Sequence, residues 1–190
     1  MASYNTSDIR NGLKVEVDGN PYTVVYFQFV KPGKGTAFTR TKLKNLLSGN
    51  VIERTFRTGE KLDAADVAEA QMQYQYNDGE SYQFMNMESY ETVGIPAKVL
   101  GDDAQWLLDN MMVNVLFYKN NPVNVDLPNF VELEVTYTEP AVKGDTSSGA
   151  LKEAEVSTGA KVMVPLFIGR GDVLKIDTRE GKYVERMSKG

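Results

Sequence analysis

Lys34 is the residue whose neighbours most clearly suit it to act on a partner molecule. It stands in the stretch KPGKG, residues 31–35, with a glycine on either side. Pro32 sets the backbone angle φ for the second position of a β-turn, and Gly33 can adopt the positive φ that a type II turn requires next. We therefore expect a hairpin tip that presents the Lys34 ammonium to solvent, although a solvated lysine in a plain turn would have the same sequence.

A basic segment surrounds this tip. Between positions 31 and 57 the chain carries seven lysines and arginines against one acid, Glu53. Such a segment fits an RNA backbone, because contacts from lysine and arginine to phosphate contribute much of the affinity of proteins for nucleic acids. The candidate RNA-facing residues are Lys31, Arg40, Lys42 and Lys44.

A nucleotide-binding P-loop is another interpretation of GKGT, residues 33–36. That motif requires serine or threonine directly after its lysine, whereas Gly35 follows Lys34 here. We therefore do not expect nucleotide hydrolysis.

Charge is unevenly distributed along the 190 residues, whose formal net charge is −5. Residues 1–65 carry 10 basic and 6 acidic side chains, residues 66–128 carry 2 and 10, and residues 129–190 carry 9 and 10. The thirds therefore differ in sign and size of charge, which indicates separate modules, one of them suited to meet phosphate.

The chain has no cysteine and no histidine. Disulfides, thiol catalysis, a Ser-His-Asp triad and the usual zinc ligand sets are therefore excluded. Adjacent acids such as Asp102 and Asp103 are the remaining catalytic candidates, but helix capping explains them better. We expect a protein that is not an enzyme and has no cofactor and no metal.

The N-terminal residues lack the basic start and apolar core of a signal peptide, and no run of apolar residues is long enough to span a membrane. We therefore expect a cytoplasmic protein with no membrane partner.

Short β-branched and aromatic runs separated by Gly, Asn, Asp and Pro predict an all-β fold of small barrels. The run 131–138, VELEVTYT, alternates as a half-buried strand does, with Val131, Leu133, Val135 and Tyr137 on one face.

Three further segments have local signals of their own. Asp78-Gly79 and Glu180-Gly181 each separate two strand-like runs and predict hairpins. Residues 21–30, PYTVVYFQFV, are apolar at both alternating sets of positions, so we expect them to be covered on both sides.

The sequence predicts one short helix, beginning near Asp102 in DDAQWLLDNM, with Gln105 three residues after this cap. Trp106 lies off the apolar face of that helix, and we expect it to pack against an adjacent strand rather than bind a ligand. The apolar face would consist of Ala104, Leu107, Leu108 and Met111.

Two polar connectors, residues 58–66 and 120–129, lie where charge and pattern change together. They divide the chain into modules 1–65, 66–128 and 129–190. Cores of about 60 residues are marginal alone, so neighbouring modules should pack on one another.

Several motifs occur together in an order that is typical of one family. They are KPGKGTAF in the first third, YNDGE and WLLDN in the second, and PNFVELEV, KGDT, GKYVER and the segment 152–171, KEAEVSTGAKVMVPLFIGRG, in the last. In all of these the chain resembles bacterial translation elongation factor P, and the resemblance covers essentially its whole length.

The resemblance implies three β-barrel domains arranged in an L that mimics tRNA: an SH3-like domain of the KOW type and two OB-folds. It also implies the function. A factor of this family binds the ribosome between the P and E sites and stimulates peptide-bond formation on ribosomes stalled at consecutive prolines. The tip that matches Lys34 reaches the acceptor end of the peptidyl-tRNA, and the ribosome remains the catalyst.

The resemblance also implies roles for particular residues. Lys34 matches the lysine that many bacteria extend covalently, in some lineages with a β-lysyl group added by a modifying enzyme, and the loop that presents it consists of Pro32, Gly33 and Gly35. Contact with the mRNA at the E-site codon would involve Gly144, Asp145 and Thr146. Tyr183 and Arg186 match a C-terminal hairpin associated with activity, although surface packing would explain them equally. The protein would act as a monomer.

An OB-fold protein that binds single-stranded nucleic acid is the alternative function. It predicts affinity for free oligonucleotides that falls steeply with salt, whereas a ribosome-dependent factor would lack that affinity.

Overall fold

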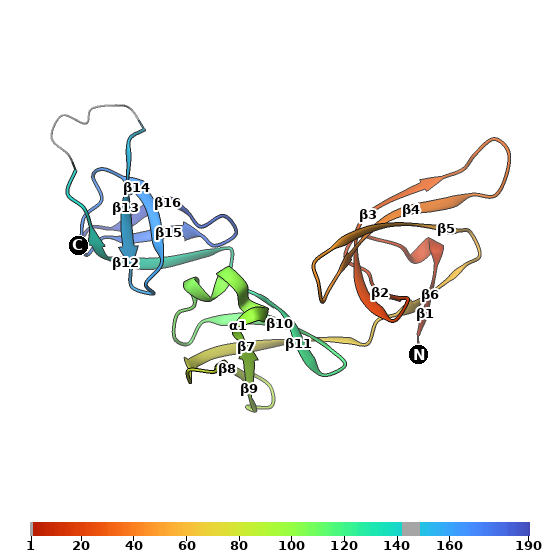
Figure 1. Ribbon diagram of the computed structural model, residues 1–190, viewed down its shortest axis with the longest axis horizontal. Helices are drawn as coiled ribbons and strands as arrows, with labels where there is room; N and C mark the ends of the chain where they lie inside the picture. The colour runs from red at the N-terminus through yellow and green to blue at the C-terminus, as the bar shows by residue number, and fades with distance from the viewer. Residues whose placement is uncertain (1, 142–148) are drawn as a thin grey trace. The chain divides into compact units, whose positions relative to one another are not determined.

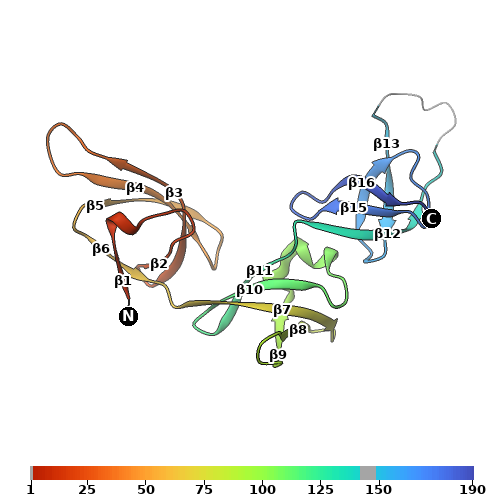
Figure 2. The ribbon, with the colours of Figure 1, turned by 180° about the vertical axis from the view of Figure 1, so that it is seen from behind.

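The chain is almost entirely β-structure. The computed structural model describes residues 2–141 and 149–190, in which sixteen strands form three antiparallel sheets (Figures 1 and 2). Helix in that part is confined to η1 (Thr6–Asp8), α1 (Ala97–Leu100) and η2 (Gly101–Trp106). The prediction of an all-β fold with one short helical region in the middle of the chain is confirmed.

The described residues form two compact units. The first runs to Glu69 and includes Val115–Asn124, and the second comprises Ala70–Asn114 and the described residues from Val125 to Gly190. No helix in the described part is long and apolar enough to cross a membrane. The module boundaries after residues 65 and 128 remain a prediction.

The first sheet has the strand order β1-β6-β2-β3-β4-β5. Its strands are β1 (Ser3–Asn5), β2 (Lys14–Val17), β3 (Asn20–Val30), β4 (Phe38–Asn45), β5 (Val51–Arg57) and β6 (Lys61–Ala64). One face buries an apolar core that includes Ile9, Val15, Val24, Leu43, Phe56 and Leu62. Along β4, Thr39, Thr41 and Leu43 are buried while the cationic residues between them are exposed, as a period of two requires.

The expectation that residues 21–30 are covered on both sides is wrong for the second half of that segment. Tyr22 and Val24 are buried, but Val25, Tyr26 and Phe29 are exposed. The physical reason is that β3 continues beyond the body of the sheet with β4 as its pairing partner, so this part of the hairpin projects into solvent (Figure 1).

The segment Val115–Asn124, which belongs to the first unit, makes a polar contact with β2. The Tyr118 hydroxyl donates a hydrogen bond to the Glu16 carboxylate, and Lys119 Nζ lies 3.8 Å from the same oxygen. The hydrogen bond to Glu16, with burial, raises the pKa of Tyr118.

The second sheet has the order β11-β10-β7-β8-β9. Its strands are β7 (Val67–Asn77), β8 (Ser81–Asn86), β9 (Thr92–Pro96), β10 (Met112–Tyr118) and β11 (Asn121–Asp126). The hairpin predicted at Asp78-Gly79 is confirmed, with Gly79 at a φ of 96°. Asp78 Oδ1 accepts hydrogen bonds from the backbone N–H groups of Glu80 and Ser81, which closes the turn.

The predicted helix is displaced towards the N-terminus. Helix α1 begins at Ala97 and continues as the 3₁₀ segment η2, which ends at Trp106. Asp102 therefore lies inside the helical segment and is not its cap, and Leu107 and Leu108 follow its end. Sequence reasoning missed the start because Pro96 precedes it, a residue that provides no side-chain cap.

The third sheet has the order β14-β13-β12-β15-β16. Its strands are β12 (Phe130–Thr138), β13 (Leu151–Val156), β14 (Lys161–Pro165), β15 (Val173–Asp177) and β16 (Lys182–Ser188). The hairpin predicted at Glu180-Gly181 is confirmed. The alternation along β12 holds for Val131, Leu133 and Val135, which are buried, but Tyr137 is 61% exposed because a register shift between Val135 and Tyr137 turns it outward.

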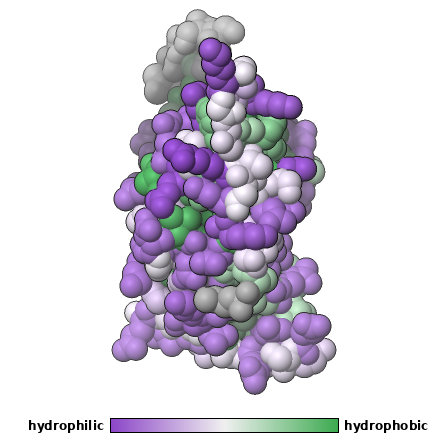
Figure 3. All heavy atoms as spheres, turned by 90° about the vertical axis from the view of Figure 1, so that its right-hand side faces the viewer, coloured by the Kyte–Doolittle hydropathy of each residue, from purple (hydrophilic) through white to green (hydrophobic). Residues whose placement is uncertain are grey.

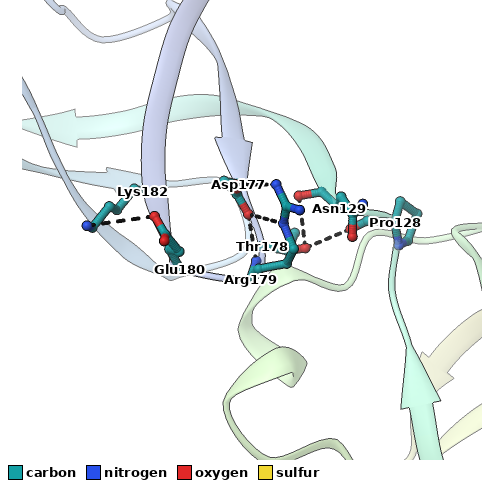
Figure 4. Close-up of polar contacts among 7 residues, drawn as sticks. All are labelled: Pro128, Asn129, Asp177, Thr178, Arg179, Glu180 and Lys182. Atoms are coloured by element: carbon teal, nitrogen blue, oxygen red, sulfur yellow. Dashed lines mark hydrogen bonds and ion pairs between the residues drawn. The ribbon is translucent and has the colours of Figure 1, made fainter. Parts of the chain in front are cut away.

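Trp106 connects the second and third sheets within the second unit. Its ring is 2% exposed and belongs to the apolar core of the third sheet, which agrees with packing rather than ligand binding. The turn before β16 is fixed to the connector before β12, because the Thr178 hydroxyl donates to the carbonyl oxygens of Pro128 and Asn129 at 2.7 and 3.1 Å (Figure 4).

Candidate functional site

The β3–β4 hairpin presents Lys34 at its end. The two strands pair in antiparallel register as far as Val30 and Phe38, and residues 31–37 form the loop between them. Figures 1 and 2 show this loop extending beyond the rest of the first sheet. The Lys34 side chain is exposed, and among the described residues no acid or hydrogen-bond acceptor lies against its ammonium. The hairpin therefore presents a fully available cation.

The turn chemistry of this loop differs from the prediction. Gly35 has the positive φ, 98°, whereas Gly33 does not. The type II turn predicted at Pro32-Gly33 is therefore wrong, because such a turn needs a positive φ at Gly33, and in this seven-residue loop the positive φ is at Gly35 instead. A Cβ at either glycine would meet nothing within 4 Å, so Gly35 is required for backbone conformation and not for space.

Three cations line an open hollow of about 710 Å³ beneath the tip: Lys34, Arg40 and Arg57. No acid lines it, and the other lining residues are Pro32, Gly35, Thr36, Phe38 and Thr55. The Arg40 guanidinium lies 5.5 Å from the centre of the Phe38 ring, which holds the cation in place without neutralising it. Arginine and lysine side chains are strong hydrogen-bond donors to phosphate, so the charge of this hollow suits a phosphate group.

Arg57 was not among the candidates from the sequence. The antiparallel register places it directly opposite Phe38, and Arg40 opposite Thr55. Residues 34, 40 and 57 come together only because the strands pair, so their spacing in the sequence did not indicate that they share a hollow.

The predicted RNA-facing residues fall into two groups. Arg40, Lys42 and Lys44 alternate along β4 and share one exposed face. Lys42 lies 5.6 Å from the centre of the Tyr26 ring, beside a second hollow of about 370 Å³ that also contains Glu53. Lys31 instead lines a separate hollow with Phe29 and Thr39. The structure thus brings three of the four residues together.

In the third sheet, Arg186 contacts a buried acid. Its Nη1 atom lies 3.5 Å from Asp172 Oδ2, and its guanidinium lies 5.0 Å from the centre of the Phe167 ring. The backbone N–H groups of Gly169 and Gly190 also donate to the Asp172 carboxylate, at 2.9 and 2.8 Å. These backbone hydrogen bonds first, and then Arg186, lower the pKa of Asp172.

Tyr183 is partly buried against the same apolar core as Trp106. Both hairpin residues singled out from the sequence therefore have partners within the protein. Gly144, Asp145 and Thr146 lie outside the described residues. No group of three or more metal-ligating side chains occurs in the described ranges.

Three family models match three successive parts of the chain, one for each sheet. The family described as "Elongation factor P (EF-P) KOW-like domain" matches residues 5–62, "Elongation factor P (EF-P) OB domain" matches 67–125, and "Elongation factor P, C-terminal" matches 131–186. The chain belongs to the elongation factor P family. Proteins of this family are translation factors and not enzymes, so the expectation that the chain is not an enzyme is confirmed.

Relatives of nearly the same length support the assignment. The chain is 54% identical to elongation factor P of Moorella thermoacetica over 182 residues, which covers 96% of this chain and 98% of that protein. It is 51% identical to elongation factor P 2 of Protochlamydia amoebophila over 189 residues, covering 99% and 100%. Elongation factor P of Syntrophomonas wolfei is 50% identical over 183 residues, covering 96% and 99%.

One solved structure shares part of the fold. A eukaryotic translation initiation factor 5A from Methanococcus jannaschii aligns with a TM-score of 0.56 and 21% identity, covering 66% of this chain and 92% of that one. The likeness supports the arrangement of strands.

Proposed function

We propose that this translation elongation factor binds the ribosome between the P and E sites and accelerates peptide-bond formation at consecutive prolines. The Lys34 loop would hold the acceptor end of the peptidyl-tRNA in a reactive geometry. The observation that carries the proposal is the free Lys34 ammonium at the end of a projecting hairpin, above a hollow lined by two arginines and no acid.

Positioning is sufficient for such an effect. Proline reacts slowly because its ring is constrained and its nitrogen is a secondary amine. Fixing the other reactant lowers the entropic part of the barrier, and each 1.4 kcal/mol or so gained in this way raises the rate about tenfold. The factor needs no acid or base of its own, which fits a chain without histidine or cysteine.

We also propose that a modifying enzyme extends Lys34, with a β-lysyl group or another adduct. The exposed side chain between two glycines is open to such an enzyme, since a Cβ at Gly33 or Gly35 would meet nothing within 4 Å. An added amine would lengthen the reach of the loop and provide further hydrogen-bond donors for the tRNA.

The remaining roles belong to the same proposal. Arg40, Lys42 and Lys44, with Lys31 on the other side of the hairpin, would contact ribosomal or transfer RNA. Gly144, Asp145 and Thr146 would approach the E-site codon. The factor would act as a cytoplasmic monomer of three domains with boundaries after residues 65 and 128, and Tyr183 and Arg186 would maintain the C-terminal hairpin.

The test is translation of a triproline reporter in the presence of the natively produced factor, its Lys34→Ala variant and a Lys98→Ala control at an exposed site on α1. An intact mass and a peptide map across Lys34 accompany it. Loss of rescue in Lys34→Ala alone would support the proposal, and an added mass on Lys34 would support the modification. Full rescue by Lys34→Ala would show that the tip is only a turn.

The alternative, a single-strand binder, is tested separately. A fluorescent oligonucleotide titrated with the factor should show no binding at moderate salt, while sedimentation with ribosomes should show association. Tight binding to the free oligonucleotide, falling steeply with salt, would favour the alternative.

A further inference from the structure

Two loops of the molecule share one hydrogen-bond pattern but have different residue types at the position with positive φ. In the β4–β5 loop, Asn45 Oδ1 accepts from the N–H groups of Leu47 and Ser48 at 2.8 and 3.1 Å, and Ser48 Oγ accepts from Asn50 at 3.3 Å. In the β8–β9 loop, Asn86 Oδ1 accepts from Glu88 and Ser89 at 2.8 and 3.1 Å, and Ser89 Oγ accepts from Glu91 at 3.3 Å.

The two loops diverge at the residue that has positive φ. The first has Gly49 there, with a φ of 78°, and the second has Tyr90, with a φ of 60°. Glycine adopts this conformation freely, whereas a side chain with a Cβ is disfavoured in it. The other non-glycine residues with positive φ in the described part are Asp, Asn and Lys, so Tyr90 is its only aromatic one.

Packing does not explain the tyrosine. Tyr90 is 70% exposed, more than any other large hydrophobic side chain in the described ranges. Its ring therefore contributes little burial to offset the unfavourable backbone. A strained residue that stabilises nothing within the protein is a candidate contact for something outside it.

The surroundings of Tyr90 indicate the charge of that partner. Residues 62–97 contain three aspartates and four glutamates, and no lysine or arginine. Glu88 and Glu91 are close to Tyr90 in the sequence and are exposed, and neither forms an ion pair within the described residues. The loop precedes β9, which is the edge strand of its sheet, so a partner has open access to it (Figure 1).

We propose that Tyr90, with Glu88 and Glu91, forms a docking site for a lysine- or arginine-bearing protein segment. The face of the tyrosine ring attracts a cation, and the two carboxylates pair with it. RNA does not fit, because the seven acids of this stretch repel phosphate. The inference rests on the proposed function in one respect, since the basic partner would be a protein of the ribosome.

The first experiment incorporates the photo-crosslinker p-benzoylphenylalanine at position 90 of the full-length factor and irradiates it with purified bacterial ribosomes. Position 76 in β7 is the control, since Tyr76 is also exposed but has ordinary strand geometry. We expect a crosslink from position 90 to a basic protein segment. A crosslink to RNA would overturn the proposed partner, and absence of any crosslink from bound factor would overturn the site.

The second experiment compares Tyr90→Gly with Tyr76→Gly. We expect Tyr90→Gly to keep or raise the melting temperature, because it restores the residue type of the sister loop, while ribosome affinity falls about fivefold or more. Tyr76→Gly should lower the melting temperature and leave affinity unchanged. A marked drop in melting temperature for Tyr90→Gly would mean that the ring is structural and would overturn the proposal.

The two proposals can fail separately. If the unmodified wild-type sequence and Tyr90→Gly bind ribosomes equally well, the docking site is wrong and the proposed function stands. If the wild type does not bind ribosomes at all, the proposed function is wrong, and the docking site falls with it.

Discussion

Single glycines determine how the Lys34 loop is built. Gly33 and Gly35 are equally open to a side chain in space, but only Gly35 has a backbone conformation that disfavours one. Substitutions at these two positions therefore distinguish the effect of backbone conformation from the effect of steric crowding.

We predict that Gly35→Ala impairs rescue of the triproline reporter while Gly33→Ala is close to wild type. The first substitution costs about 1 kcal/mol or more at a positive φ, and the loop will relieve this by moving Lys34. Translation rates of the reporter measure the rescue by each variant, and denaturant unfolding measures the stability cost of each substitution. Equal rescue by the two variants would mean that the exact loop conformation is unimportant.

Asp172 is a buried carboxylate whose surroundings favour its ionised form. Its folded pKa lies below the unfolded value, so its contribution to stability is fully present above about pH 4 and is lost as the pH falls through the folded pKa. We predict that Asp172→Asn is less stable than wild type at neutral pH and that the difference shrinks as the pH falls below about 4. Unfolding free energies across that range measure it, and parallel curves for the two proteins would contradict it.

At the scale of elements, the turn of the β15–β16 hairpin packs closely against Trp106 at the end of η2. A Cβ on Gly181 would lie 3.2 Å from the Trp106 ring, and its φ is 68°. Gly79 in the β7–β8 hairpin also has a positive φ, but a Cβ there would meet nothing within 4 Å. The two hairpins thus share the conformational requirement and differ in packing.

We predict that Gly181→Ala destabilises the protein by about 2–4 kcal/mol and Gly79→Ala by about 1 kcal/mol. The additional cost at position 181 comes from displacing a buried ring. The fluorescence of Trp106, the single tryptophan of the chain, should also change in Gly181→Ala alone. Equal losses of unfolding free energy in the two variants would show that the Trp106 ring can move aside without destabilising the protein.

At the scale of the whole molecule, the charges are segregated by segment. The exposed cations of β4 contrast with residues 62–97, which contain no lysine or arginine. The face seen in Figure 3 is mainly hydrophilic, with smaller apolar patches. A protein with a net charge of −5 can therefore meet RNA with one segment while other segments repel it.

We predict that Lys42→Ala weakens ribosome binding and lowers the slope of log affinity against log salt by about one, as the loss of one phosphate contact requires. Lys98→Ala should leave both quantities unchanged. Binding measured by sedimentation at several salt concentrations decides this. An unchanged slope in Lys42→Ala would mean that Lys42 does not contact phosphate.

The sequence by itself determined what depends on near neighbours. The alternation of Val131, Leu133 and Val135, the hairpins at Gly79 and Gly181, and the family motifs are all local patterns. Each residue in them is placed by the period of a strand or the φ of a turn, and these are properties of short segments.

The tertiary structure decided what depends on distant partners. Strand pairing placed Arg57 beside Lys34 and Arg40, and it left the second half of β3 exposed. The partner of Arg186 is a carboxylate fourteen residues away, and Trp106 is buried in the core of another sheet. The sequence predicted that Trp106 packs against a strand, but it could not predict which partners these residues meet, because register and packing are set by contacts between segments that are distant in the sequence.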